Sequence, residues 1–167
     1  MSRRYGVMPG KVVDRDDPQG EGRVKVSFPW MGNDAQGYWA PVASLMGGGD
    51  RGAWIMPELE DEVLVAFEQG DVEHPYIVGF LHNGEHRPPE TDPKVRLLRS
   101  VNGHEIALND PSILAGDTGG IRIEDAQGNR IELSNGRITI FSVGQIEITA
   151  PTVIINGRVV APIPAPI

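Results

Sequence analysis

Short runs of alternating apolar and polar residues, separated by glycines, fill the last third of the chain. The run RITIF would place Ile138 and Ile140 on one face of a β-strand, and QIEIT repeats this with Ile146 and Ile148 eight residues later. The glycines that separate these runs recur at eight-residue steps, at Gly120, Gly128, Gly136 and Gly144. Because Gly adopts positive φ at little cost, we predict a turn at each glycine and one strand per repeat.

A repeat this short cannot enclose a hydrophobic core, so several repeats must stack, either along one chain or between chains. A ladder formed by one chain would leave an exposed apolar strip and free sheet edges. Three copies wound about a threefold axis would remove both problems. The apolar runs step by ten, seven and eight residues, so we expect a longer turn at DAQGN. The predicted trimer core consists of Ile121, Ile123, Ile131, Leu133, Ile138, Ile140, Ile146, Ile148 and Ile154.

The first half of the chain predicts a separate small barrel. Five alternating strands are expected in residues 6–82, including GRVKVSF, YWAPVASLM, EDEVLVAF and PYIVGFL, a size typical of the OB-fold. Residues 83–94 are polar and rich in proline, which is typical of a stiff linker. The runs VRLLRS and HEIAL then predict two more strands before the glycine repeats. The expected domains are therefore a barrel at 1–82, a linker at 83–94, a needle at 95–160 and a tip at 161–167.

Composition supports an all-β chain and excludes several functions. The 167 residues include 14 prolines and 21 glycines, which suit many short strands better than long helices. The net charge of −8 argues against a nucleic-acid backbone as the main partner. The chain contains no cysteine, so neither disulfides nor thiolate metal sites are available. No secretory signal is recognisable at the start, so we expect synthesis in the cytoplasm and export only as part of an assembly.

Two segments of the sequence resemble a known family. PELEDEVLVAF, followed by HPYIVGFLHNG, resembles the OB-fold domain of the phage baseplate protein V and VgrG family of central spike proteins. IRIEDAQGNRIELSNGRITIFSVGQIEITA resembles the intertwined, trimeric triple-stranded β-helix that follows this domain in the family. The resemblance covers residues 6–160. It implies a non-enzymatic homotrimeric spike in the baseplate of a contractile injection machine, such as a phage tail, a tailocin or a type VI system, which helps to pierce the target envelope. Hub or tube-initiator proteins would bind at the barrel end.

The sequence departs from the family at both ends. It begins almost at the barrel, so it resembles the short protein V type, which would need separate hub proteins. Some short spikes end in a His-x-His motif that binds iron, but the last histidine here is His104, so we expect no axial metal. The chain ends in RVVAPIPAPI, and proline cannot extend a hydrogen-bonded ladder. A PAAR-like tip protein is therefore expected to dock on Val160, Pro162, Ile163, Pro164, Pro166 and Ile167, the alternatives being a self-capping tip or a frayed tail.

Two binding alternatives remain. The aromatic residues Trp30, Tyr38, Trp39 and Trp54 are the kind that stack on bases in OB-folds, but no basic groove accompanies them, so roles in the core or in trimer contacts are expected. A cluster of His74, His82 and His86, or a loop with Asn109, Asp110 and Asp117, contains possible metal ligands, although loop positions favour solvated side chains.

A cell-wall hydrolase would require paired carboxylates held in a cleft. Only Glu85 and Glu90 of the short linker occupy the corresponding place, and we expect both to be solvated. The sequence contains no nucleophile elbow, phosphate loop or zinc signature. We therefore expect no catalytic residues and no cofactor.

Overall fold

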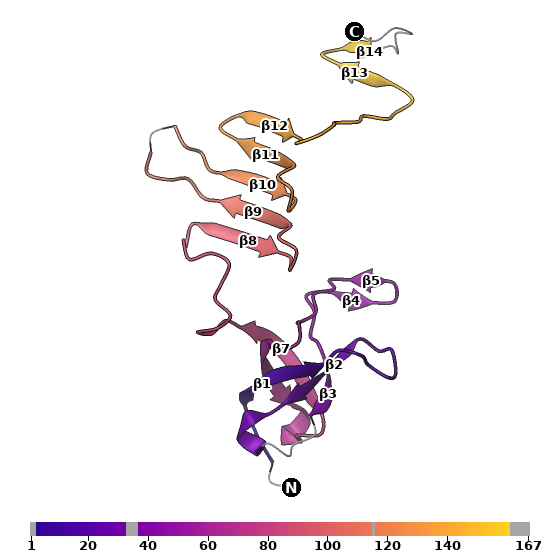
Figure 1. Cartoon of the computed structure of the whole chain (residues 1–167), viewed down its shortest axis with the longest axis vertical. Helices are drawn as coiled ribbons and strands as arrows, with labels where there is room; N and C mark the ends of the chain where they lie inside the picture. The colour runs from indigo at the N-terminus through magenta and orange to yellow at the C-terminus, as the bar shows by residue number, and fades with distance from the viewer. Residues whose placement is uncertain (1–2, 33–36, 115, 161–167) are drawn as a thin grey trace. The chain divides into compact units, whose positions relative to one another are not determined.

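The structure is a computed structural model that describes residues 3–32, 37–114 and 116–160 (Figure 1). The chain divides into two compact units, Met1–Pro88 and Pro89–Ile167. Apart from two single 3-10 turns, η1 (Pro29–Met31) and η2 (Glu68–Gly70), all regular elements in the described ranges are strands, which confirms the predicted all-β class. Within these ranges no helix is long and apolar enough to cross a membrane.

The first unit is a curled antiparallel sheet of five strands. They are β1 (Val7–Asp14), β2 (Arg23–Ser27), β3 (Tyr38–Pro41), β6 (Glu62–Phe67) and β7 (Pro75–Leu81), in the order β3-β2-β1-β6-β7. A parallel bridge between Val42 and Ile77 brings the two ends of the sheet together. The sheet therefore curls into a nearly closed barrel, as Figure 1 shows.

The barrel core follows the alternation of the strands. In β6, Val63, Val65 and Phe67 are buried while the residues between them are partly exposed. The other buried apolar residues of the cluster are Val12, Val24, Val26, Phe28, Ala40, Val72 and Ile77. A single-sided apolar face closed on itself gives one core with few polar groups to satisfy.

Strand β7 leaves several of its large side chains exposed. Alternation would place Tyr76, Val78 and Phe80 on one face, and each is more than 40% exposed, whereas Ile77 is fully buried. The pairing with β6 does not keep them on one face, because Tyr76 lies opposite Ala66 but Phe80 lies opposite the buried Val63. The register of β7 against β6 shifts between Leu64 and Val65. A β-bulge of this kind re-aims the side chains that follow it. The exposed side chains of β7 are therefore largely apolar.

The expected third strand, YWAPVASLM, is shorter than the pattern predicts. It ends at Pro41, and the chain continues through Val42 into a long connection to β6. This connection contains a small hairpin of β4 (Gly47–Gly48) and β5 (Arg51–Gly52). Proline at the strand end and the glycine-rich run GGGDRG account for the early break.

The second unit begins with a five-stranded antiparallel meander. Its strands are β8 (Val95–Arg99), β9 (Glu105–Asn109), β10 (Gly120–Glu124), β11 (Arg130–Ser134) and β12 (Arg137–Phe141), each paired with the next (Figure 1). A separate hairpin of β13 (Val153–Ile155) and β14 (Arg158–Val160) follows. The longer turn predicted at DAQGN is the connection between β10 and β11, closed by a hydrogen bond from the Asp125 amide to the Asn129 carbonyl.

The four repeat glycines occupy three different environments. Gly128 and Gly136 adopt positive φ, 93° and 72°, in the turns before β11 and β12. Gly144 lies at a bend after β12 without positive φ. The turn predicted at Gly120 is wrong, because this residue is the first of β10 and pairs with Ser134. The turn there uses Gly119 (φ 72°), whose added Cβ would lie 2.3 Å from the Asn109 carbonyl oxygen.

The strand predicted at QIEIT is also wrong for the single chain. The residues from Gln145 to Ala150 form no strand, and no strand in the described part of the chain pairs with them. Ile146 and Ile148 are accordingly exposed. An alternating sequence becomes a strand only where a neighbouring backbone completes its hydrogen bonds. Within residues 3–32, 37–114 and 116–160, this segment has no such neighbour.

Candidate functional site

One face of the five-stranded sheet in the second unit is lined by apolar side chains, and we call it the apolar face. The strand register aligns these side chains in columns that run across all five strands. One column contains Leu98, Ile106, Ile123, Ile131 and Ile140. The other column begins with Arg96 in β8 and continues with the apolar residues Leu108, Ile121, Leu133 and Ile138 in β9 to β12. Directly opposed apolar side chains of this kind form a continuous surface.

Burial in this unit is inverted relative to an ordinary sheet. The apolar side chains of the face are 39–69% exposed. The residues between them, on the other face, are mostly half-buried, and Ala107 and Glu105 are buried. Burying the part of these side chains that is still exposed would contribute about 1 kcal/mol of favourable free energy per side chain, or on the order of 10 kcal/mol per chain. A contiguous exposed patch of this kind marks an interaction surface.

The structure brings together most, but not all, of the predicted core residues. Those of β10, β11 and β12 lie on the apolar face: Ile121, Ile123, Ile131, Leu133, Ile138 and Ile140. Ile146 and Ile148 lie in the irregular stretch, and Ile154 lies in β13. Sequence reasoning missed Leu98, Ile106 and Leu108, although the alternation in VRLLRS and HEIAL carries the same signal. The apolar face is therefore longer than the glycine repeats indicated.

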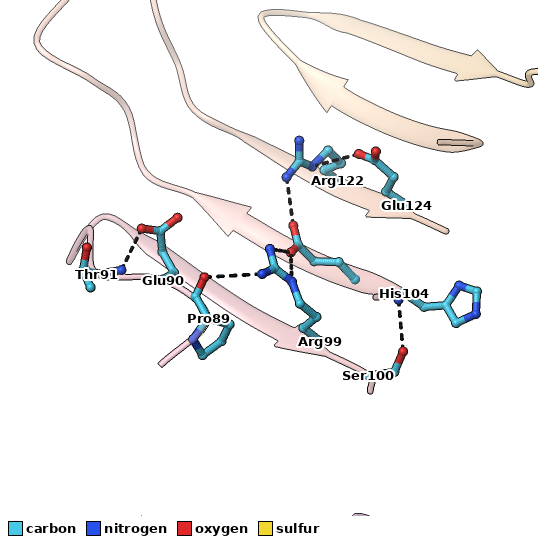
Figure 2. A network of polar contacts seen from close by, with 9 residues as sticks. Pro89, Glu90, Thr91, Arg99, Ser100, His104, Arg122 and Glu124 are labelled. Atoms are coloured by element: carbon cyan, nitrogen blue, oxygen red, sulfur yellow. Dashed lines mark hydrogen bonds and ion pairs between the residues drawn. The ribbon is translucent and has the colours of Figure 1, made fainter. Parts of the chain in front are cut away.

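The opposite face of the sheet contains a network of charges, shown in Figure 2. Glu105 is only 7% exposed and pairs with Arg99 and, at 2.8 Å, with the Arg122 guanidinium. Arg122 also lies 3.4 Å from the Glu124 carboxylate, and Arg99 donates to the Pro89 carbonyl oxygen. Most of these charged groups are paired within the chain, although the buried Arg122 Nε has no hydrogen-bond partner among the described residues. This face is therefore polar and internally paired, in contrast to the apolar face.

The Arg122 and Arg99 hydrogen bonds hold the pKa of Glu105 below its usual value, against the opposing effect of burial. A lowered carboxyl pKa stabilises the fold above the ordinary Glu pKa, and this contribution is lost as the pH falls through the lowered value. Replacing Glu105 with Gln should therefore cost roughly 1–3 kcal/mol at pH 7. Chemical unfolding of both proteins from pH 7 to pH 3 should show this gap close below about pH 4.5. A gap that stays constant with pH would contradict a role for the charge.

The loops of the second unit use their acidic residues for internal contacts. Asp117 accepts hydrogen bonds from the amides of Ser112 and Gly119, and bonds to Ser112 lower its pKa to about 2. Asp110 pairs with Arg96 at 2.5 Å. Among the described residues no group of three histidine or acidic side chains is arranged to hold a metal ion. The carboxylates of Asp117 and Asp110 therefore stabilise the loops through contacts within the chain.

The aromatic residues of the first unit do not form a common surface. Trp30 and Tyr38 pack against Phe28, and their ring centroids lie 5.5 and 6.3 Å from the Phe28 ring centroid. The Arg4 guanidinium lies over the Trp30 ring in a cation–π contact. Trp30 is 37% exposed and Trp54 is 74% exposed. A stacking platform for single-stranded nucleic acid needs several exposed rings along a basic groove. The positions of Trp30 and Tyr38 favour a structural role.

Together, the curled barrel and the second unit define an all-β chain that joins an OB-type domain to a sheet with an exposed apolar face. Two family models match it in this order. Residues 8–82 match the type VI secretion system/phage-baseplate injector OB domain, and residues 94–160 match the phage baseplate V C-terminal trimerisation domain. The chain belongs to the phage baseplate V family. The apolar face thus lies in the part of the chain that matches a trimerisation domain.

Several curated relatives are type VI secretion system spike proteins of Pseudomonas aeruginosa. The chain is 36% identical to VgrG5 over 111 residues, which is 64% of this chain and 13% of VgrG5. It is 35% identical to VgrG4b over 125 residues, or 72% of this chain and 14% of the relative. It is 33% identical to VgrG2a over 91 residues, or 50% of this chain and 10% of the relative. The chain therefore spans only a small part of the length of these relatives.

Proposed function

We propose that the protein is a structural central spike in the baseplate of a contractile injection machine, in which three copies form a rigid needle that helps to pierce the target envelope. The observation that carries this proposal is the exposed apolar face on the unit that matches a trimerisation domain. The names of the relatives, which are spike proteins of secretion systems, support the same function.

In the proposed needle, the apolar faces of three chains meet at a threefold axis. The side chains of Ile123, Ile131 and Ile140 would then contact their counterparts, and the charge network around Glu105 would face water. The irregular segment from Gln145 to Ala150 would acquire its missing neighbours from the other chains and become a strand. If that new strand pairs with β12 of a neighbouring chain, it also covers the free edge of β12, which is an aggregation hazard in a single chain.

The proposed role is mechanical rather than catalytic. In the prism that three such chains would form, each backbone group pairs with a neighbouring strand and apolar side chains fill the axis. The prism therefore resists bending and compression. Force applied along such a prism is transmitted to its end. The carboxylates of Asp110 and Asp117 make contacts within the chain, so we propose no catalytic role for either residue.

Two further partners follow from the family resemblance. Hub or tube-initiator proteins would bind the first unit, which matches the injector OB domain of type VI secretion systems and phage baseplates. A PAAR-like tip protein would dock on the apolar, proline-rich end. Val160 in β14, the last described residue, is exposed. The remaining predicted docking residues, from Pro162 to Ile167, lie outside the described residues.

The experiment that tests this function is the mass of the purified chain in solution. Multi-angle light scattering should give three times the chain mass of 18.1 kDa, and the trimer should resist dissociation by detergent because its strands interlock. Negative-stain images should show a narrow rod attached to a wider base. A stable monomer near the chain mass would rule out the needle.

A further inference from the structure

A second apolar surface lies on the first unit, far in sequence from the apolar face. It combines the connection between β3 and β6 with exposed residues of β7. We call it the loop patch, and it consists of Leu45, Met46, Trp54, Ile55, Val78 and Phe80, which line one hollow. Leu45 is 95% exposed and Trp54 is 74% exposed, both unusual for large apolar residues.

The loop patch is held in place by its own backbone. The Ser44 hydroxyl lies within hydrogen-bond distance of the Met46 and Ala53 carbonyl oxygens, and the Ala53 amide donates to Met46 at 2.9 Å. The Trp54 ring rests on Gly22, where an added Cβ would lie 2.4 Å from the ring. The apolar side chains are therefore presented by a fixed loop. Docking on such a surface costs little ordering entropy.

The loop patch is also nearly free of charge in an acidic protein. Asp50 and Arg51 are the only charged residues between Val42 and Pro57, and their charges cancel, while β7 has none. Glu21 is the one other charged residue that lines the hollow among the described residues. The whole chain has a net charge of −8, so copies of it repel one another over most of their surface. Identical copies can approach most closely where the surface is neutral and apolar.

The connection to the second unit brings copies of the loop patch close together. Strand β7 ends at Leu81 and β8 begins at Val95, so the intervening segment can span at most about 45 Å. Once the second units associate, the first units share a small volume, with an effective concentration in the millimolar range. At this concentration even a modest apolar contact is populated. An apolar surface at such concentration that stayed exposed would be an aggregation hazard.

We propose that the loop patch packs against the loop patches of the other copies, so that the first unit makes an inter-chain contact of its own. This contact rests on the trimer proposed above. It is separate from the apolar face, since it involves different residues in a different unit. It would orient the barrels relative to one another and present a symmetric base.

The absence of cysteine from the chain allows a direct test. The full-length variant Leu45→Cys should form covalent dimers on mild oxidation, because two of the three thiols around an axis can join. In the unoxidised trimer its thiol should react with a maleimide reagent at least tenfold more slowly than that of Glu73→Cys. Glu73 is an exposed loop residue of the same unit outside the loop patch, and serves as the matched control. In urea the two thiols should react equally fast.

Two results would overturn the proposal, and they can be told apart. If the protein has three times the chain mass but both thiols react at the same rate and no covalent dimer forms, the loop patch is free and only this inference fails. If the protein is a monomer, the spike and the contact between barrels both fail.

Discussion

Replacing Ile140 with Asp should abolish trimer assembly and leave a folded monomer. Ile140 is 60% exposed in the single chain, so the carboxylate is solvated there and the sheet can still form. In the proposed trimer, three carboxylates would meet in a dry interior, and each buried, unpaired charge costs several kcal/mol. Light scattering should therefore show the mass fall from three times 18.1 kDa to a single chain.

The matched control for this variant is Arg137→Asp. Arg137 lies in the same strand, β12, but on the opposite face, where it is exposed and pairs across the sheet with Ser134. It introduces the same side chain without placing it on the proposed axis, so the trimer should persist. If both variants remain trimeric, the apolar face is not the interface. If both become monomeric, assembly is sensitive to charge in β12 generally.

Replacing Phe28 with Ala should destabilise the first unit by about 3–5 kcal/mol. Phe28 is 1% exposed and sits at the centre of the aromatic cluster, with the Phe67 ring at 5.2 Å and the Trp30 ring at 5.5 Å. Deleting the ring leaves a cavity that this barrel cannot fill by small movements. For a unit of this size, the melting temperature should fall by about 15 °C or more.

Tryptophan fluorescence measures this effect selectively, because Trp30, Trp39 and Trp54 all lie in the first unit. Phe28→Leu is the control, since it retains most of the volume and should cost only about 1 kcal/mol. The Phe28→Ala protein should remain a trimer at low temperature, because the second unit carries the main interface. A loss of trimer in this variant, without unfolding of the second unit, would mean that the barrels dominate assembly.

Alternation identified both units in the sequence but not the direction of every face. In β6, the alternation in EDEVLVAF places Val63 and Val65 on one face, and both are buried. In β7, Tyr76, Val78 and Phe80 are all exposed, but they do not share one face. A bulge opposite Leu64 and Val65 interrupts the alternation, and a bulge is a property of two paired strands, so it cannot be recognised in either strand alone.

The glycine repeats identified the turns only in part. Gly128 and Gly136 have the positive φ that makes glycine favourable, but Gly120 belongs to a strand, and its neighbour Gly119 forms the turn. Adjacent glycines are equivalent in the sequence. The close approach of Gly119 to the Asn109 carbonyl distinguishes them only in the folded chain.

The sequence by itself determined that this chain is all-β, with a barrel followed by a repeating sheet, because alternation and glycine spacing are local properties. Only the tertiary structure decided which surfaces lack partners. The successive pairing of the five strands from β8 through β12 aligns their apolar side chains into one exposed face. In the described part of the chain, no strand pairs with the segment from Gln145 to Ala150. Both depend on contacts between residues distant in sequence, since hydrogen bonding and burial are satisfied between strands and not along them.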